Sequence, residues 1–306
     1  MNPFTVVVPC STSNLGPGFD SLGLALSGPD LMVRVLPGGD RLRIGKLSGE
    51  GSGRLPLDSQ NRVIQAAHRT AVESNREPAS LAAELFIHSS IPLKRGLGSS
   101  AAAALAGALV AYQLLDGDIG YDAVLQAAVE MEGHPDNVVP SLRGGAQVSL
   151  RDADGRVYSC AIPLKRSLKA ALYIPDQELA TSAARAVLPR EVPLEDAVFN
   201  LSRSAMMVAA LASGQIELLA QAMQDRLHQP ARSGLLPWLP GILEAACKAG
   251  ACGAALSGAG TTVCALCTSD EARSVATAMM AYATAQGVVG RAEVVDAGVP
   301  GASISF

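Results

Sequence analysis

The segment "GLGSSAAAALAGALVAYQLL" at residues 96–115 constrains the fold more than any other part of the chain. Residues 101–115 are mostly alanine, leucine and other apolar residues that favour an α-helix. Because apolar side chains fall on every face of that helix, it has to be buried. The run is shorter than the roughly 18 to 20 apolar residues that a membrane span needs. The sequence therefore predicts a buried helix in a soluble protein with no membrane partner.

The size and composition of the chain predict two domains with a substantial core. The chain has 306 residues, of which 49% are hydrophobic and 17% charged, so disorder is not expected. The polar, proline-containing segment at 161–170 is the best candidate boundary, which gives expected domains at residues 1–165 and 166–306. The net charge of −4 argues against a general nucleic-acid surface.

The cysteines and the N-terminal segment indicate a cytoplasmic protein. Six cysteines are dispersed along the chain, which is typical of a reducing compartment. The start "MNPFTVVVPC" has no basic region followed by an apolar stretch and a cleavage site, so secretion is not expected. Cys264 and Cys267 have Cys-x-x-Cys spacing, but "TTVCALC" is typical of a strand, where these two side chains face opposite sides. We interpret them as ordinary core or surface cysteines.

Strand-like and helix-like patterns interleave without the regular alternation of a doubly wound sheet, which favours an α+β fold. The strand patterns lie at residues 4–8, 30–36, 83–89, 145–150, 157–162, 169–175, 261–267, 291–297 and 302–306. The helix patterns lie at residues 61–75, 99–115, 121–132, 179–187, 195–213, 215–228, 240–249 and 270–286.

The glycine-rich loop before the alanine-rich helix has the features of an anion site. Gly96 and Gly98 can adopt positive φ and let backbone N–H groups approach a ligand. Ser99 or Ser100 can cap the helix. The first turn of a helix has unpaired N–H groups and a partial positive charge, which together favour phosphate.

Lys94 and Arg95 add positive charge close to this loop. The lysine precedes the glycines, so the loop is not a Walker motif, and residue 101 is alanine, so G-x-G-x-x-G is also excluded. An ordinary turn with a capped helix is an equally good interpretation of the loop alone.

Two other glycine-bearing stretches strengthen the phosphate interpretation. Each stretch alone is more typical of a tight turn, but three such turns in one chain are harder to explain in that way. The polar and glycine residues are Asn14, Gly16, Gly18 and Asp20 in "PCSTSNLGPGFDSLGLAL" (9–26), and Ser257, Gly258 and Gly260 in "GAALSGAGTTVCAL" (253–266).

The combined motifs resemble the GHMP small-molecule kinases over nearly the whole chain. "PLKRGLGSSAAAALAG" is similar to the phosphate-binding motif of that family, and "LSGAGTT" to its third motif. "SNLGPGFDSLGLAL" and "HPDNVVPSLRGG" are similar to the forms found in the branch that phosphorylates homoserine. The resemblance implies a ribosomal-protein-S5-domain-2-like N-terminal domain with a left-handed βαβ unit, a ferredoxin-like C-terminal domain and a homodimer.

The resemblance also implies that ATP and Mg²⁺ are bound. Ser100 and Glu132 are the expected metal ligands, with Ser99 and Glu130 as alternatives. The two glutamates can also be interpreted as a solvated helix end. The expected ATP-binding residues are Pro92, Lys94, Arg95, Gly96, Leu97, Gly98, Ser99, Ser100 and Ala101, with Asn61 near adenine.

The acceptor implied by the resemblance is L-homoserine, phosphorylated on its side-chain hydroxyl to O-phospho-L-homoserine for threonine biosynthesis. Asp136 and Asn137 are the expected catalytic residues, and proton removal by Asp136 is left open. His134 is interpreted as structural. The expected acceptor-binding residues are Asn14, Asp20, Asn137, Thr181, Arg185, Arg232 and Gly258. A kinase for another small alcohol, such as a mevalonate- or shikimate-like one, and a non-catalytic nucleotide-binding protein are the alternatives.

Overall fold

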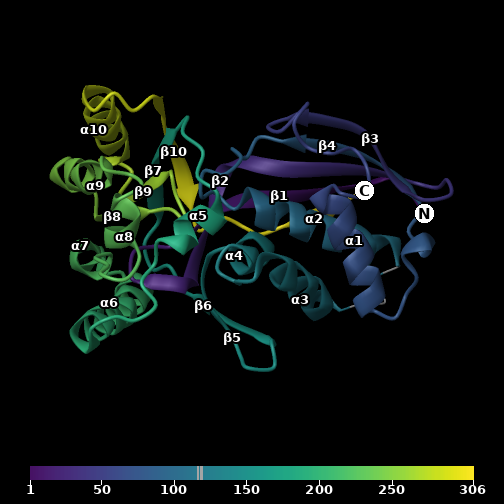
Figure 1. The fold of residues 1–306 in the computed structure, drawn as a ribbon, viewed down its shortest axis with the longest axis horizontal. Helices are drawn as coiled ribbons and strands as arrows, with labels where there is room; N and C mark the ends of the chain where they lie inside the picture. The colour runs from purple at the N-terminus through teal and green to yellow at the C-terminus, as the bar shows by residue number, and fades with distance from the viewer. Residues whose placement is uncertain (116, 118–119) are drawn as a thin grey trace.

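The computed structural model describes residues 1–115, 117 and 120–306 and has the predicted α+β architecture (Figure 1). In these residues one sheet runs in the order β11-β1-β2-β10-β7-β9-β8, and β3 to β6 are connected to it through β2. The strands are β1 (Phe4–Asn14), β2 (Gly18–Pro37), β3 (Leu42–Gly49), β4 (Ala83–Ser89), β5 (Ala146–Arg151), β6 (Val157–Ile162), β7 (Leu168–Pro175), β8 (Gly253–Leu256), β9 (Val263–Cys267), β10 (Gly290–Ala297) and β11 (Ser303–Ser305).

The α-helices lie on the sheet in two groups, one in each half of the chain (Figure 1). They are α1 (Arg62–Glu73), α2 (Ser99–Leu114), α3 (Tyr121–Glu132), α4 (Val138–Arg143), α5 (Thr181–Ala186), α6 (Leu194–Ser213), α7 (Leu219–Ala222), α8 (Gln229–Ser233), α9 (Leu239–Lys248) and α10 (Ala272–Ala285). Short 3₁₀ turns lie at Pro78–Ser80 and Ile216–Leu218. Of the helices in the described residues, none is both long and apolar enough to cross a lipid bilayer.

Helix α2 is the buried centre of the N-terminal half, as its all-apolar composition predicts. Most of its residues from Ala101 to Ala111 are buried. The helix contacts α1, α3, β1 and β2, and Figure 1 shows α1 to α4 together on one side of these strands. Gly107 lets α1 approach closely, because a Cβ at this position would lie 2.1 Å from the carbonyl oxygen of Val63. This packing holds α2, and with it the N-terminal end of the helix, in place on the sheet.

A βαβ unit precedes this central helix. Strands β3 and β4 are parallel neighbours, and α1 lies between them in the chain. The resemblance implies such a unit, and its left-handedness stays a prediction.

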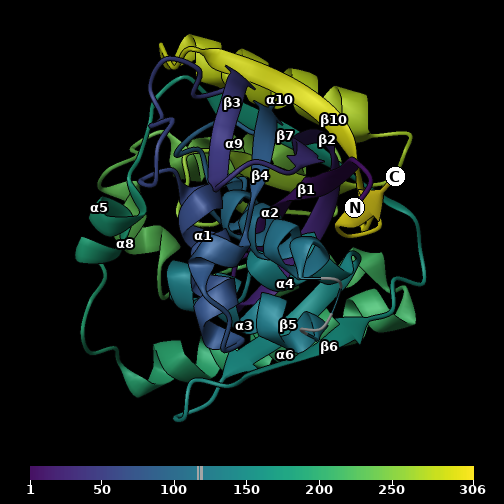
Figure 2. The same cartoon turned by 90° about the vertical axis from the view of Figure 1, so that its right-hand side faces the viewer.

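The C-terminal half has the ferredoxin-like order βαββαβ. Strand β7 is followed by helices α5 to α9, the hairpin β8–β9, α10 and β10. The antiparallel order is β10-β7-β9-β8. Helices α9 and α10 pack on these strands, and Figure 2 shows α10 along β10. Cys264 belongs to the main core and Cys267 to the second core under α9 and α10, so the prediction of core cysteines in a strand is confirmed.

The long strand β2 connects the two halves. It pairs with β1 between Gly18 and Val35, with β4 over Leu31–Pro37, with β5 over Leu22–Leu24, and with β10 at Leu26. The expected boundary after residue 165 lies in the connection between β6 and β7. We propose that the two domains meet there.

The predicted helix at 215–228 is wrong beyond residue 222. The Asp225 carboxylate accepts hydrogen bonds from the backbone N–H groups of Leu227, His228 and Gln229. This side chain offers the backbone an alternative to helical hydrogen bonds, so the segment forms a turn.

Candidate active site

Six stretches that are far apart in the sequence surround a cavity of about 250 Å³. Its lining contains every site residue that the sequence predicts, except Asn61 and Ala101. The lining residues are Ser13, Asn14, Phe19, Asp20, Pro92, Lys94, Arg95, Gly96, Leu97, Gly98, Ser99, Ser100, Glu132, His134, Asp136, Asn137, Ala180, Thr181, Arg185, Arg232, Gly258 and Ala259.

Hydrogen bonds between the glycine-bearing segments hold this cavity together. The Ser257 hydroxyl donates to Gly96 O at 2.6 Å and lies 2.8 Å from Thr12 Oγ1, and the Gly258 amide donates to Ser13 O at 3.1 Å. A Cβ at Gly96 would lie 2.1 Å from Ser257 O, so only glycine fits this approach. The three stretches that the sequence analysis singled out therefore form one structure.

The start of α2 differs from the prediction in its cap. Gly98 is the N-cap residue, with φ of 73°, and no side chain caps the helix, so the expected serine cap at Ser99 or Ser100 is wrong. Both serines lie in the first helical turn and line the cavity. A helix start without a side-chain cap has N–H groups available for an anion.

The two basic residues before the loop have different environments. Arg95 donates from Nε to Pro175 O at 2.6 Å and from Nη1 to Leu93 O at 2.8 Å, so its guanidinium ties the loop to the end of β7. The Lys94 ammonium is half-exposed and lies 3.4 Å from Glu178. Hydrogen bonds from Arg54 and Lys94 lower the pKa of Glu178 to about 2. Lys94 is therefore the more exposed of the two positive charges.

Ser100 and Glu132 are brought together as predicted. The Ser100 hydroxyl donates to Glu132 Oε1 at 2.8 Å, and Arg62 of α1 pairs with the same carboxylate oxygen. Glu130, the alternative ligand, does not line the cavity and pairs with Arg69. A hydroxyl and a carboxylate beside an uncapped helix start are hard oxygen donors, which suit Mg²⁺ next to phosphate.

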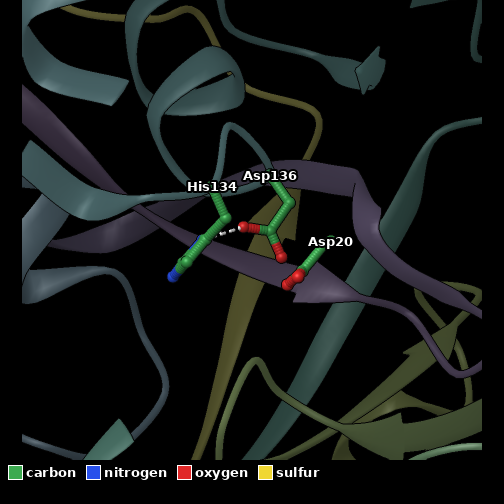
Figure 3. A group of neighbouring side chains, drawn as sticks. All are labelled: Asp20, His134 and Asp136. Carbon is green, nitrogen blue, oxygen red and sulfur yellow. Dashed lines mark hydrogen bonds and ion pairs between the residues drawn. The ribbon is translucent and has the colours of Figure 1, made fainter. Parts of the chain in front are cut away.

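Asp20, His134 and Asp136 form a second cluster in the cavity lining, and Figure 3 shows their side chains converging. Their ligand atoms lie within 4.8 Å of one another. His134 Nδ1 is 2.5 Å from Asp136 Oδ1. Burial lowers the pKa of His134, but the hydrogen bond and charge of Asp136 outweigh it, so the pKa is raised above its ordinary value.

Two arginines approach this cluster from the C-terminal half. Arg185 forms a two-point ion pair with Asp20, with N–O distances of 2.7 and 3.0 Å. Arg232 is buried, and its Nη1 donates to Gly258 O at 2.9 Å. The cavity thus places the Asp20 carboxylate near the guanidinium groups of Arg185 and Arg232, the complement of an amino acid's charges.

Three asparagines use their amides mainly within the protein. Asn14 donates to Gly258 O and accepts from the Asp20 amide. Asn137 is bonded to serines of β1. Asn61 caps α1 by accepting from Val63 N, and lies outside the cavity lining. Its expected contact with adenine stays a prediction, as do the roles of the other two.

Comparison with known proteins agrees with this arrangement. The family model for the GHMP kinases N terminal domain matches residues 61–145, and that for the GHMP kinases C terminal matches residues 207–283. A homoserine kinase of Moorella thermoacetica is 42% identical over 284 residues, covering 92% of this chain and 93% of the relative. This chain is a GHMP kinase.

Two further relatives are similar over nearly the full length of this GHMP kinase. A homoserine kinase of Deinococcus radiodurans is 45% identical over 275 residues, covering 90% of this chain and 87% of the relative. The crystal structure of a homoserine kinase from Cytophaga hutchinsonii has a TM-score of 0.88 and 29% identity, covering 99% of this chain and 98% of that one.

Sequence reasoning missed several residues of this GHMP kinase site. Ser13, Phe19, Ala180 and Ala259 line the cavity, and His134 is paired with a cavity carboxylate. All four of these lining residues are adjacent in the sequence to predicted ones, so their position next to a motif residue was the available signal.

Proposed function

We propose that this protein transfers the γ-phosphoryl group of ATP to the side-chain hydroxyl of L-homoserine, giving O-phospho-L-homoserine for threonine biosynthesis. The observation that carries the proposal is the pairing, in one cavity, of an uncapped helix start with a carboxylate and two arginines. The relatives at 42% and 45% identity are named homoserine kinase, which supports the same acceptor.

The ATP phosphates would lie on the first turn of α2, over Gly96 to Ser100. Backbone N–H groups there are positioned before the substrate arrives, so they stabilise developing charge without reorganisation. Lys94 would approach the phosphates from the loop, while Arg95 keeps the loop in place.

Ser100 and Glu132 would hold Mg²⁺, since their oxygens are 2.8 Å apart and face the same cavity. The bound metal would neutralise charge on the β- and γ-phosphates. Arg62 fixes the Glu132 carboxylate in position to do so.

The acceptor would be held by its two charged groups. Asp20 would bind the ammonium, and Arg185 and Arg232 the carboxylate, since a guanidinium can donate to both carboxylate oxygens. The acceptor's ammonium and carboxylate would replace the contacts that Asp20 and Arg185 make with each other. Asp136, supported by His134, would orient the hydroxyl and accept its proton.

A coupled ADP-release assay with four acceptors tests the proposal. The acceptors are L-homoserine, mevalonate, shikimate and galactose, each with ATP and Mg²⁺. Turnover with L-homoserine at least tenfold above the others is expected. Turnover with one of the other alcohols alone would reject the acceptor assignment but keep the kinase activity.

A homodimer formed through α6 is also part of the proposal. Leu194, Val198 and Leu201 are 80%, 55% and 72% exposed, and Ala205 and Val208 continue their alternating spacing of four and three. This repeat is typical of a helix that packs against another helix. Figure 1 shows α6 at the edge of the molecule.

The charges at the ends of α6 favour a second copy as the occupant. Glu195 lies in the first turn, and Lys165 lies against the last turn, where its amide donates to Leu211 O. Antiparallel pairing of two α6 helices places the acidic end of each beside the basic end of the other. We also propose a cytoplasmic location for the protein, because all six cysteines are free thiols, as is typical of proteins in a reducing compartment.

A further inference from the structure

The guanidinium group of Arg232 is hydrogen-bonded through Nε and Nη1, which leaves Nη2 as the third nitrogen. Its Nε donates to Ala184 O at 3.3 Å, and its Nη1 donates to Gly258 O at 2.9 Å and lies 3.0 Å from His228 Nδ1. No partner for Nη2 occurs among the residues that the structure describes, although Arg232 lines the cavity. The Nη2 group is therefore the donor available to a ligand.

The contact with Arg232 fixes the protonation of His228. A guanidinium only donates hydrogen bonds, so Nδ1 of His228 has to be an acceptor without a proton. The ring proton is then on Nε2, which donates to Gly16 O at 2.8 Å. His228 is a neutral bridge between the N-terminal motif and Arg232.

The surroundings of His228 keep this bridge rigid. The ring is buried, and its centroid lies 5.3 Å from that of Phe19. Asp225 accepts from the backbone amides of residues 227–229 and from Asn200 Nδ2 at 2.6 Å. The charged groups that act on the ring are Asp225, Arg232 and Asp20. Burial, the largest effect, lowers the pKa of His228 and keeps the ring neutral.

We propose that His228 is a positioning residue: in its neutral form with the proton on Nε2, it holds Arg232 so that Nη2 meets the carboxylate of the amino-acid acceptor. This inference rests on the proposed function and deepens it. The preference for acceptors with a carboxylate then depends on a residue that does not line the cavity.

Two substitutions separate the two hydrogen bonds of the ring. In His228→Asn, the amide oxygen takes the place of Nδ1 as acceptor for Arg232, and the bond to Gly16 is lost. In His228→Gln, the amide N–H group takes the place of Nε2 as donor to Gly16, and Arg232 loses its acceptor. The pair changes size little and tests which bond matters.

The readout is kcat/KM for L-homoserine divided by kcat/KM for 3-aminopropan-1-ol, which has the amine and hydroxyl but no carboxylate. Both kcat/KM values of a ratio are measured on the same preparation, so the fraction of enzyme that is folded affects them equally and drops out of the ratio. We expect about a tenfold or larger fall in this ratio for His228→Gln, from loss of a hydrogen bond to a charged group. For His228→Asn the ratio should stay within about threefold of the wild-type ratio. The KM for ATP should be unchanged in both variants.

An equal ratio for wild type and His228→Gln would overturn the inference while homoserine phosphorylation by the wild type stands. If the wild type does not phosphorylate homoserine, the proposed function itself fails. Should His228→Gln not fold, ¹⁵N chemical shifts of the wild-type ring still decide. A neutral ring with the proton on Nε2 is expected at neutral pH, and a charged ring or a proton on Nδ1 contradicts the inference.

Discussion

Arg185 and Asp20 are joined in the cavity lining by a two-point ion pair, with N–O distances of 2.7 and 3.0 Å. They come from the two halves of the chain, and each is the proposed partner of one charged group of the acceptor. An acceptor with both charges replaces their mutual contacts with two new ones. An acceptor with only one charge leaves an arginine or an aspartate without its partner.

Asp20→Asn therefore should raise the KM for L-homoserine by about 10- to 100-fold, because a hydrogen bond between charged groups is lost. The KM for ATP should change less than about twofold, since Asp20 does not belong to the helix start. Steady-state kinetics with each substrate varied in turn measure both. An unchanged KM for homoserine would contradict the assignment of Asp20.

Ser100→Ala and Glu132→Gln should each lower kcat by about 100-fold or more, with a smaller effect on the KM for ATP, because contacts to developing charge act mainly in the transition state. Titration of Mn²⁺ in the presence of ATP should show weaker metal binding. Glu130→Gln is the matched control, since Glu130 pairs with Arg69 outside the cavity. Equal losses in kcat and ATP affinity would exclude the metal role.

The pH dependence of stability should reflect His228. Because burial lowers its pKa in the folded state, the unfolded chain binds the extra proton first as pH falls. The stabilisation is complete above the ordinary pKa of 6.5 and is lost as pH falls below it toward the folded value. Urea unfolding between pH 5 and 7.5 measures the slope, which should be smaller in His228→Asn. The same slope in both proteins would rule out His228 as its source.

Leu201→Glu should convert the proposed dimer into a monomer, because it places a charge in the middle of the apolar stripe of α6. Light scattering after size-exclusion chromatography reports the mass. Val289→Glu is the control: Val289 is 71% exposed and lies outside α6. A wild-type protein that is monomeric at micromolar concentration would reject the α6 interface.

Cysteine labelling should separate buried from exposed thiols. Burial raises the pKa of Cys10, Cys264 and Cys267 to about 12, which keeps them protonated and unreactive. Cys160 is exposed and should react with a thiol reagent within minutes in the native state. The three buried thiols should react only after denaturation, and rapid reaction of Cys264 would show that β9 opens.

The strands and helices with strong periodicity could be predicted from the sequence. The bounds of β4 and β6 coincide with the expected 83–89 and 157–162. Strand β3 was missed because only Leu42 of its eight residues is buried, so the strand shows no alternation of buried and exposed side chains. The turn at 223–228 was missed because a single aspartate side chain overrides a helical pattern.

The motif residues could be assigned to the site from the sequence because the motif segments themselves form the wall of the cavity. The hydrogen-bond partners of those residues could not be predicted, since they come from distant segments of the chain. Arg62 reaches Glu132 across 70 positions, and His228 reaches Gly16 across 212. Such pairs depend on tertiary packing and have no sequence spacing that predicts them.

Strand β2 ties the two halves together as one shared element. It runs for 20 residues and pairs with β1, β4 and β5 and with β10, although its register with β1 shifts between Ala25 and Asp30, where Gly28 has a φ of 101°. In the C-terminal half, Arg232 donates to the Ala184 carbonyl of α5, the six-residue helix that carries Arg185. The two proposed ligands of the acceptor carboxylate are therefore coupled through this short helix.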